Sequence, residues 1–185
     1  MENRLKEILS SIARDGSLFE EAVLAAKERQ KILAKPTGAL GRLEDISVQI
    51  AGITGKVIND IAKKAIVIMS ADNGVVEEGV ASAPQSVTLS QTINFIRGLT
   101  GVSSIAKHFA IDLLVVDMGV KLPIPDSLYT DTPFEDGSLT KKILNRSIAR
   151  GTNNLSAGPA MTRNQALTAI LEGVACAQAV KICGY

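Results

Sequence analysis

Hydrophobic residues recur at helical spacing through the first sixty residues. The first apolar stripe consists of Leu18, Ala22, Val23 and Ala26, and the second of Leu43, Ile46, Ile50 and Ile53. Ser17 and Glu20 have the spacing of a capping box ahead of the first stripe. Its helix should end before Lys35-Pro36, because proline disfavours helical geometry in the preceding residue. The pattern predicts a helical segment over residues 1–60.

From Ala65 onward the pattern changes to short, continuous apolar runs. AIVIM and IDLLVVDMGV are typical of strands that are buried on both faces of a parallel sheet. Between them, residues 87–109 repeat at helical spacing, with a bend or break expected at Gly98 and Gly101. The order strand, helix, strand predicts a right-handed βαβ unit, so residues 61–185 are expected to form an α/β part.

Residues 121–160 contain several prolines and glycines and carry no clear period. Thr162 and Gln165 then form a second capping box, which predicts a final helix running to Cys183-Gly184. Two evident strands are fewer than the five or six of a typical sheet. We therefore expect the chain to be the first half of a larger protein, or one half of a fold completed by a second chain.

Composition narrows the possible partners. The net charge of +1 gives no electrostatic basis for binding nucleic acid or an anionic membrane, and aromatic residues are only 3% of the chain. No apolar run approaches the length of a membrane span, and the start lacks a signal-peptide core. Cys176 and Cys183 are expected to be buried free thiols. These features predict a cytoplasmic protein.

Polar residues follow the two predicted strands at the edge where parallel sheets bind ligands. Asp72, Asn73 and Gly74 follow the first strand, and Asp117 closes the second. Turn formation alone would also explain Asp and Gly at these positions. The hydroxyls and amides of Ser82, Gln85, Ser90 and Gln91 lie around the next helix start and suit a neutral heteroaromatic ligand. The alternative is that Ser86 or Thr88 simply caps that helix.

Two other polar segments have alternative interpretations. Lys35 and Arg42 in KPTGALGR suit a phosphate, but a helix–helix turn explains the glycines equally well. The donors between Asn145 and Asn154 suit either a phosphate or a partner subunit. Neither GxxxxGK[ST] nor GxGxxG occurs, so the common nucleotide-binding signatures are missing. The only histidine, His108, has no catalytic pattern around it.

An ordered set of segments resembles the nicotinate-nucleotide:dimethylbenzimidazole phosphoribosyltransferase family, which makes the lower ligand of cobalamin. The set is KPTGALGRLEDISVQIAGITG, MSADNGVVEEGV with VT and NFIRG after it, VVDMGV, and LNRSIARGTNN leading into PAMTRNQAL. The resemblance covers about Lys35 to Tyr185. It implies a Rossmann-like parallel sheet with flanking helices, a small helical subdomain at the N-terminus, and a homodimer.

The resemblance also implies a reaction: phosphoribose moves from nicotinate mononucleotide to 5,6-dimethylbenzimidazole or a similar base, giving α-ribazole 5'-phosphate and nicotinate. No metal or cofactor is expected, because nicotinate leaves from a pyridinium. The family's GEMGIGNTT-type motif and catalytic glutamate would lie beyond Tyr185, so residues 1–185 are expected to be inactive alone. Asp72, Asn73, Gly74, Ser82, Gln85, Ser90 and Gln91 are the expected substrate-binding residues. The alternative is a non-catalytic ligand-binding half or a truncated paralogue completed by a partner chain.

At two positions the sequence departs from the family. Ser90, with Gln91 beside it, stands where several members carry glutamine, and Ala83 stands where some carry an aromatic residue. Both differences bear on which base is preferred.

Overall fold

The computed structural model describes residues 1–15 and 18–185. These residues fall into two compact units. One unit comprises Asn3–Ile61, and the other comprises Ala62–Tyr185 together with Met1–Glu2. The assignment of residues 1–60 and 61–185 to separate domains stays a prediction.

The first unit is helical, as its apolar spacing predicts. Its helices are α1 (Glu2–Asp15), α2 (Glu20–Ile32) and α3 (Arg42–Thr54). Small residues hold α2 against α3, since Ala22, Ala26 and Ala51 are the buried members of their shared core. The larger residues of the α3 stripe stay open to solvent, with Leu43 63% and Ile53 60% exposed. Ser17 of the predicted capping box lies outside the described residues.

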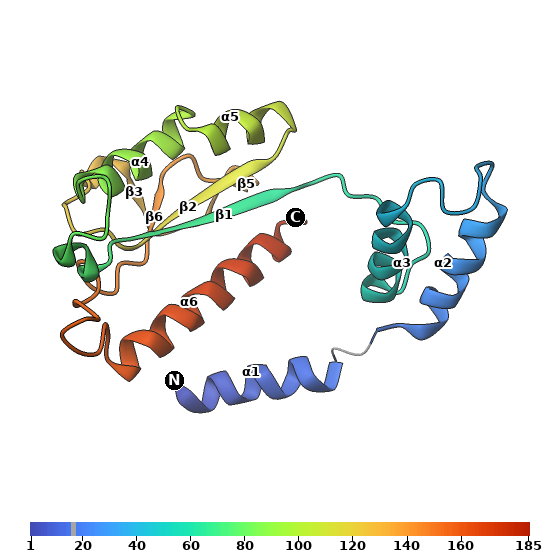
Figure 1. Cartoon of the computed structure of the whole chain (residues 1–185), viewed down its shortest axis with the longest axis horizontal. Helices are drawn as coiled ribbons and strands as arrows, with labels where there is room; N and C mark the ends of the chain where they lie inside the picture. Colours follow the sequence, from blue (N-terminus) through green and yellow to red (C-terminus); the bar gives the residue numbers. More distant parts are fainter. Residues whose placement is uncertain (16–17) are drawn as a thin grey trace. The chain divides into compact units, whose positions relative to one another are not determined.

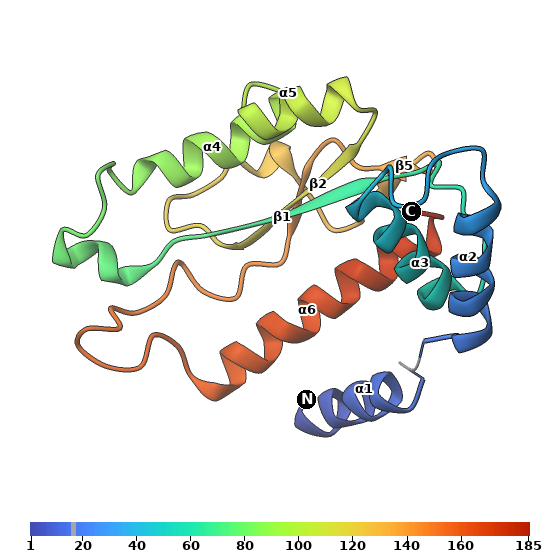
Figure 2. The ribbon, with the colours of Figure 1, turned by 45° about the vertical axis from the view of Figure 1, so that its right-hand side comes forward.

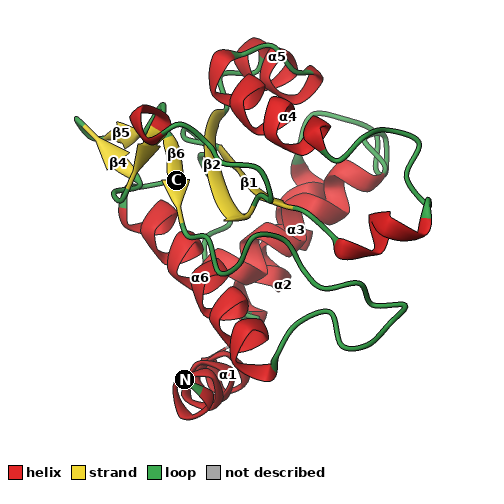
Figure 3. Ribbon diagram, turned by 90° about the vertical axis from the view of Figure 1, so that its left-hand side faces the viewer, coloured by secondary structure: helices red, strands yellow, loops and turns green. Residues whose placement is uncertain are grey.

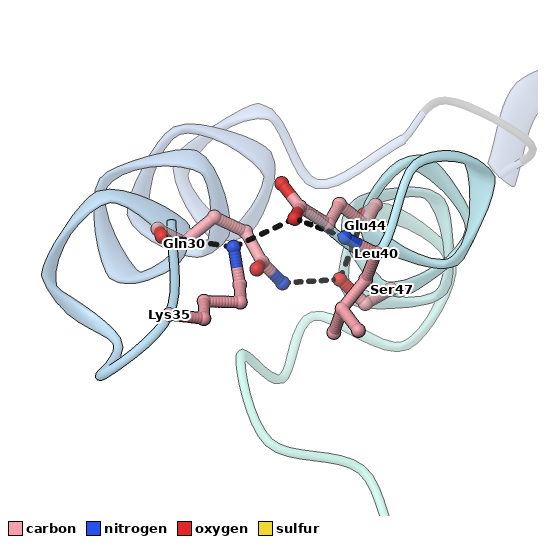
Figure 4. A network of polar contacts seen from close by, with 5 residues as sticks. All are labelled: Gln30, Lys35, Leu40, Glu44 and Ser47. Atoms are coloured by element: carbon pink, nitrogen blue, oxygen red, sulfur yellow. Dashed lines mark hydrogen bonds and ion pairs between the residues drawn. The ribbon is translucent and has the colours of Figure 1, made fainter. Parts of the chain in front are cut away.

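A polar network fixes the connection between α2 and α3 (Figure 4). The Lys35 ammonium donates to Glu44 Oε1 at 2.7 Å, and both side chains are largely shielded, with relative exposures of 13% and 14%. The same oxygen accepts the Leu40 amide at 3.1 Å, while Gln30 donates to Ser47 Oγ at 2.7 Å. Lys35 is therefore committed to Glu44, which favours the helix–helix turn over the phosphate-binding interpretation of KPTGALGR.

The second unit is built on a parallel sheet of four strands in the order β1-β2-β6-β3. The strands are β1 (Ala65–Ala71), β2 (Asp112–Gly119), β3 (Tyr129–Thr130) and β6 (Ile143–Asn145). A separate antiparallel hairpin pairs β4 (Phe134–Glu135) with β5 (Ser138–Leu139). The predicted parallel α/β arrangement is confirmed.

Helices cover both faces of this sheet. Helices α4 (Ser86–Arg97) and α5 (Gly101–His108) lie on one face, and α6 (Arg163–Ile182) lies on the other (Figures 1 and 2). The break predicted at Gly98 and Gly101 separates α4 from α5. Two short 3-10 helices, η1 (Gly74–Glu78) and η2 (Asp126–Leu128), lie in the connections.

Strand β2 forms the centre of the core because its side chains alternate between the two faces. Leu114 and Val116 pack with Leu144 and Cys176 toward α6. On the opposite face, Val115 packs with Ile143 and with partly buried residues of α4. Leu114, Val115 and Val116 are at most 1% exposed, so the prediction of a fully buried strand is confirmed for β2.

The same prediction is wrong for β1. Among the described strands only β2 pairs with it, so β1 is an edge strand whose residues are mostly half-buried, and Met69 is 44% exposed. Two further strands, β3 and β6, which the sequence did not reveal, extend the parallel sheet to four strands. These strands have two and three residues, too few for an apolar period to appear in the sequence.

The last helix begins as its capping box predicts. Thr162 Oγ1 accepts the Gln165 amide at 3.2 Å, and Gln165 Oε1 accepts the Thr162 amide at 2.8 Å. At the other end, the Tyr185 hydroxyl donates to Asp112 Oδ2 at 2.6 Å and so fastens the helix terminus to the start of β2. Both cysteines are free thiols, as predicted; Cys176 is buried, and Cys183 is only partly buried.

Candidate functional site

The connections that follow β1, β2 and β6 meet beyond the carboxyl ends of these strands. Figure 3 views the sheet from this side. Asp72 lies at their junction. Its amide donates to the Gly119 carbonyl at 3.0 Å, and its carbonyl accepts the Thr152 amide at 3.0 Å. Asp72 Oδ2 accepts the Lys121 amide at 2.7 Å. One residue thus joins the three connections, and only 4% of its surface is exposed.

Two glycines allow these connections to approach so closely. A Cβ on Gly74 would lie 2.5 Å from the carbonyl carbon of Asn153, and one on Gly119 would lie 2.7 Å from the Ala149 carbonyl oxygen. Gly74 also donates its amide to Thr152 Oγ1 at 3.1 Å. Gly74 is therefore required by backbone packing, and we assign it a supporting place in the site.

Asp117 organises the turn after β2. Its Oδ1 accepts the amides of Gly119 at 2.9 Å and Val120 at 2.8 Å, and its Oδ2 accepts the Tyr129 hydroxyl at 2.5 Å. Burial, together with this bond to Asp117, raises the pKa of Tyr129 well above its ordinary range. With both oxygens occupied, the Asp117 carboxylate acts as a structural anchor. It lines a separate polar cavity of about 280 Å³ together with Asn145, Ser147 and Arg150.

Two cavities share Ala71 and Asp72 as a common wall. The small cavity, of about 90 Å³, lies between the strand ends and the start of α6. Its main lining residues are Met118, Ile148, Thr152, Met161 and Gln165. The large cavity, of about 350 Å³, lies between η1 and the start of α4. Its main lining residues are Asn73, Val75, Val76, Ala81, Gln85 and Thr88. Of these two, only the large cavity reaches the roughly 300–1,000 Å³ of small-molecule sites.

Of the predicted substrate-binding residues, Asp72, Asn73 and Gln85 line the large cavity, and Gly74 supports it from behind. Ser82, Ser90 and Gln91 are exposed and lie outside its lining. Ser90 instead donates to the Ser86 carbonyl at 3.2 Å, within α4. A contact between these three residues and a ligand stays a prediction.

The capping alternative for Ser86 or Thr88 is wrong. Helix α4 has Gln85 at its N-cap, and no side chain in the described part of the chain caps it. Backbone carbonyls satisfy its first amides instead, since Val87 donates to Pro84 at 3.0 Å and Thr88 to Gln85 at 3.1 Å. The Gln85 side chain therefore remains available to the cavity.

The structure adds residues that the sequence did not single out. Lys121 and Thr152 hold Asp72 in place, and Met161 and Gln165 line the small cavity. The donor-rich segment from Asn145 to Asn154 was the signal for Thr152. Arg146 of that segment pairs with Glu172 at 3.2 Å, so it serves packing against α6. Within residues 1–15 and 18–185, no three metal-binding side chains gather closely enough to hold an ion.

The fold and these cavities define an α/β protein of the doubly wound class, with its ligand crevice at the carboxyl ends of parallel strands. The phosphoribosyltransferase family model matches residues 17–185, and the chain belongs to the nicotinate-nucleotide:dimethylbenzimidazole phosphoribosyltransferase family.

Named relatives of this family match nearly the whole chain. A nicotinate-nucleotide–dimethylbenzimidazole phosphoribosyltransferase of Clostridium perfringens is 43% identical over 181 residues, covering 98% of this chain and 45% of the relative. One of Clostridium tetani is 44% identical, covering 92% and 43%. The crystal structure of a Thermus thermophilus enzyme of that name superimposes with a TM-score of 0.78 at 34% identity, covering 89% and 46%. The chain thus spans about half the length of these relatives.

No helix in the described residues is long and apolar enough to cross a membrane.

Proposed function

We propose that this chain supplies the base-receiving part of an enzyme that transfers phosphoribose from nicotinate mononucleotide to 5,6-dimethylbenzimidazole or a similar base. The products are α-ribazole 5'-phosphate and nicotinate, as required for assembly of the cobalamin nucleotide loop. One observation carries the proposal: in a chain of this family, the large cavity lies at the carboxyl end of β1. Its apolar wall carries a few polar groups, at Asp72, Asn73 and Gln85.

These surroundings suit a flat, weakly polar heterocycle. Val75, Val76 and Val80 offer apolar contact to a ring, and the carboxylate and two amides fix its orientation. The exposed Ser82, Ser90 and Gln91 are proposed to contact the base from the direction of α4. In the reaction, the bond between C1' and the nicotinate nitrogen breaks while a benzimidazole nitrogen bonds to C1'. The other nitrogen of the base gives its proton to a carboxylate.

We further propose that residues 1–185 alone bind the base but do not transfer phosphoribose. The Asp117 carboxylate already accepts three hydrogen bonds, and the proton acceptor implied by the family resemblance is a glutamate outside these residues. The same resemblance supports a homodimer, which sedimentation would reveal as twice the subunit mass. The free thiols support placement in the reducing cytoplasm. The reaction itself is proposed to need neither metal nor cofactor.

A transfer assay tests the proposal. The complete gene product is incubated with nicotinate mononucleotide and dimethylbenzimidazole, and products are followed by mass spectrometry. We expect α-ribazole phosphate and nicotinate in equal amounts. Base binding without transfer would overturn the assignment in favour of a non-catalytic binding protein. In parallel, the 185-residue chain, purified free of other enzymes, should form no product. Turnover by this chain would contradict the proposal that it binds the base without transferring phosphoribose.

A further inference from the structure

The short helix η1 forms one wall of the large cavity. Val75 and Val76, which belong to η1, line the cavity directly, and Val80 lines it just beyond the end of η1. A 3-10 helix has poor hydrogen-bond geometry, so its five residues are held only weakly by their own backbone bonds. The shape of the large cavity therefore depends on the contacts that hold η1 from outside.

The connection after β6 contacts η1 at both ends. At the first residue of η1, Gly74 donates its amide to Thr152 Oγ1 at 3.1 Å. At the last residue, Glu78 Oε1 accepts the side-chain amide of Asn154 at 2.5 Å. The two partners lie 78 and 76 positions further along the chain. Two side chains of one distant loop therefore hold the cavity wall.

The fold of its own loop orients the Asn154 side chain as a donor toward Glu78. Asn154 Oδ1 accepts the Ser156 amide at 3.0 Å, and the Asn154 carbonyl accepts the Ala157 amide at 3.1 Å. With its oxygen engaged in this turn, the side chain presents its NH₂ group to the Glu78 carboxylate. Hydrogen bonds to a charged group are roughly twice as strong as neutral ones. Neither residue lines the large cavity, so the pair can act on a ligand there only through η1.

We propose that Asn154 is a positioning residue for the base: it fixes Glu78, and through Glu78 it fixes the valine wall against which the ring packs. This inference rests on the proposed function, because it concerns the same base-receiving cavity. The contact needs one donor and one acceptor across positions 78 and 154. Base affinity should therefore depend on that pairing, and not on which of the two positions supplies the donor.

Exchanging the donor and the acceptor between the two positions tests the proposal. Asn154→Asp keeps an oxygen for the Ser156 amide but sets a second carboxylate oxygen against Glu78, so the contact should be lost. Glu78→Gln keeps an acceptor for the Asn154 amide, so the contact should remain. In the double variant Asn154→Asp/Glu78→Gln, the new amide at position 78 can donate to the new carboxylate at position 154, and the contact should be restored.

The complete protein of each variant is titrated with 5,6-dimethylbenzimidazole, and steady-state transfer gives kcat and the KM of each substrate. We expect Asn154→Asp to weaken base binding by about 5-fold or more, with kcat and the KM of nicotinate mononucleotide within about 2-fold of wild type. Glu78→Gln and the double variant should bind the base within about 2-fold of wild type. Asn164→Asp adds the same charge at the exposed start of α6, outside the lining of both cavities, and should behave as wild type.

The outcomes separate this inference from the proposed function. Base affinity that is unchanged in Asn154→Asp, or weakened there and not restored by Glu78→Gln, would overturn the inference and leave the base-binding function standing. An equal loss for both substrates would also overturn it, because it would indicate general damage to the fold. Failure of the wild type to bind the base would overturn the proposed function. Should Asn154→Asp fail to fold, Glu78→Ala removes the same contact by truncating an exposed side chain. Unchanged base affinity in Glu78→Ala would then overturn the inference.

Discussion

Among single residues, Gly74 occupies a position with no room for a side chain. A methyl group there meets backbone atoms of Thr152, Asn153 and Asn154 at 2.5–2.6 Å, and backbone cannot move aside as a flexible side chain can. We expect Gly74→Ala to lower the free energy of unfolding by about 1–3 kcal/mol, the usual cost of overpacking. Urea denaturation followed by circular dichroism measures this change.

Gly158 provides the matched control for Gly74. A Cβ added there meets nothing within 4 Å among the described residues. Gly158→Ala should therefore change the unfolding free energy by no more than about 0.5 kcal/mol. Equal destabilisation by both substitutions would show that the connections after β1 and β6 are not packed as closely as described.

Some residues of the candidate site could be predicted from the sequence, and others could not. Asp72 and Asn73 could be predicted because they follow an evident strand, where ligand sites lie in parallel sheets. Lys121 could not be assigned, because it holds Asp72 through its backbone amide, and a backbone contact leaves no mark on residue type. Thr152 lies in the donor-rich segment, but its contacts with Asp72 and Gly74 could not be predicted. Gly74 was predicted to bind substrate, whereas its structural role arises from a segment nearly eighty residues away.

At the scale of elements, the α2–α3 connection depends on the Lys35–Glu44 ion pair. The hydrogen bond from Lys35, followed by the Leu40 amide, lowers the pKa of Glu44 below its ordinary value of 4.5. A carboxylate with a lowered folded-state pKa stabilises the fold at pH values above the unfolded pKa. That stabilisation is lost as the pH falls through the folded-state pKa.

Glu44→Gln should therefore destabilise the helical unit at neutral pH and have progressively less effect as the pH falls below about 4.5, where wild-type Glu44 also becomes protonated. Denaturant unfolding of both proteins at pH 7 and across the acid range measures the difference. Glu28, paired with Lys31 at 2.7 Å but 70% exposed, is the matched control. Glu28→Gln should have little effect at any pH, since exposed pairs contribute little. A pH-independent effect of Glu44→Gln would contradict the account.

Elements were predictable in proportion to their length. Helices α2, α3, α4, α5 and α6 and strands β1 and β2 each span at least seven residues. The helices were predicted from apolar spacing or a capping box, and the two strands from continuous apolar runs. Strands β3 and β6 were not predicted, because a pattern cannot be recognised in two or three residues. They are strands because β6 pairs in parallel with β2, and β3 pairs in parallel with β6. The edge position of β1 was also hidden, since an apolar run does not report how many strands flank it.

At the scale of the whole molecule, the family and the parallel α/β architecture followed from an ordered set of segments. Their order carries more information than any single motif, because each segment maps to a connection or an element of the same fold. The cavities could not be predicted from the sequence. They are bounded by η1, the start of α4, and the connections after β2 and β6, whose proximity only the folded chain establishes.

The role of the large cavity is tested most directly by a titration of 5,6-dimethylbenzimidazole onto the protein before and after that cavity is filled. Ala81 lines that cavity and is exposed at its rim, so Ala81→Phe adds bulk there without disturbing the buried core. We predict saturable binding of one base per chain in the wild type and a loss of affinity of about 10-fold or more in Ala81→Phe, since filling a pocket removes ligand contact. Unchanged affinity in Ala81→Phe, or no saturable binding in the wild type, would contradict the claim that the large cavity receives the base.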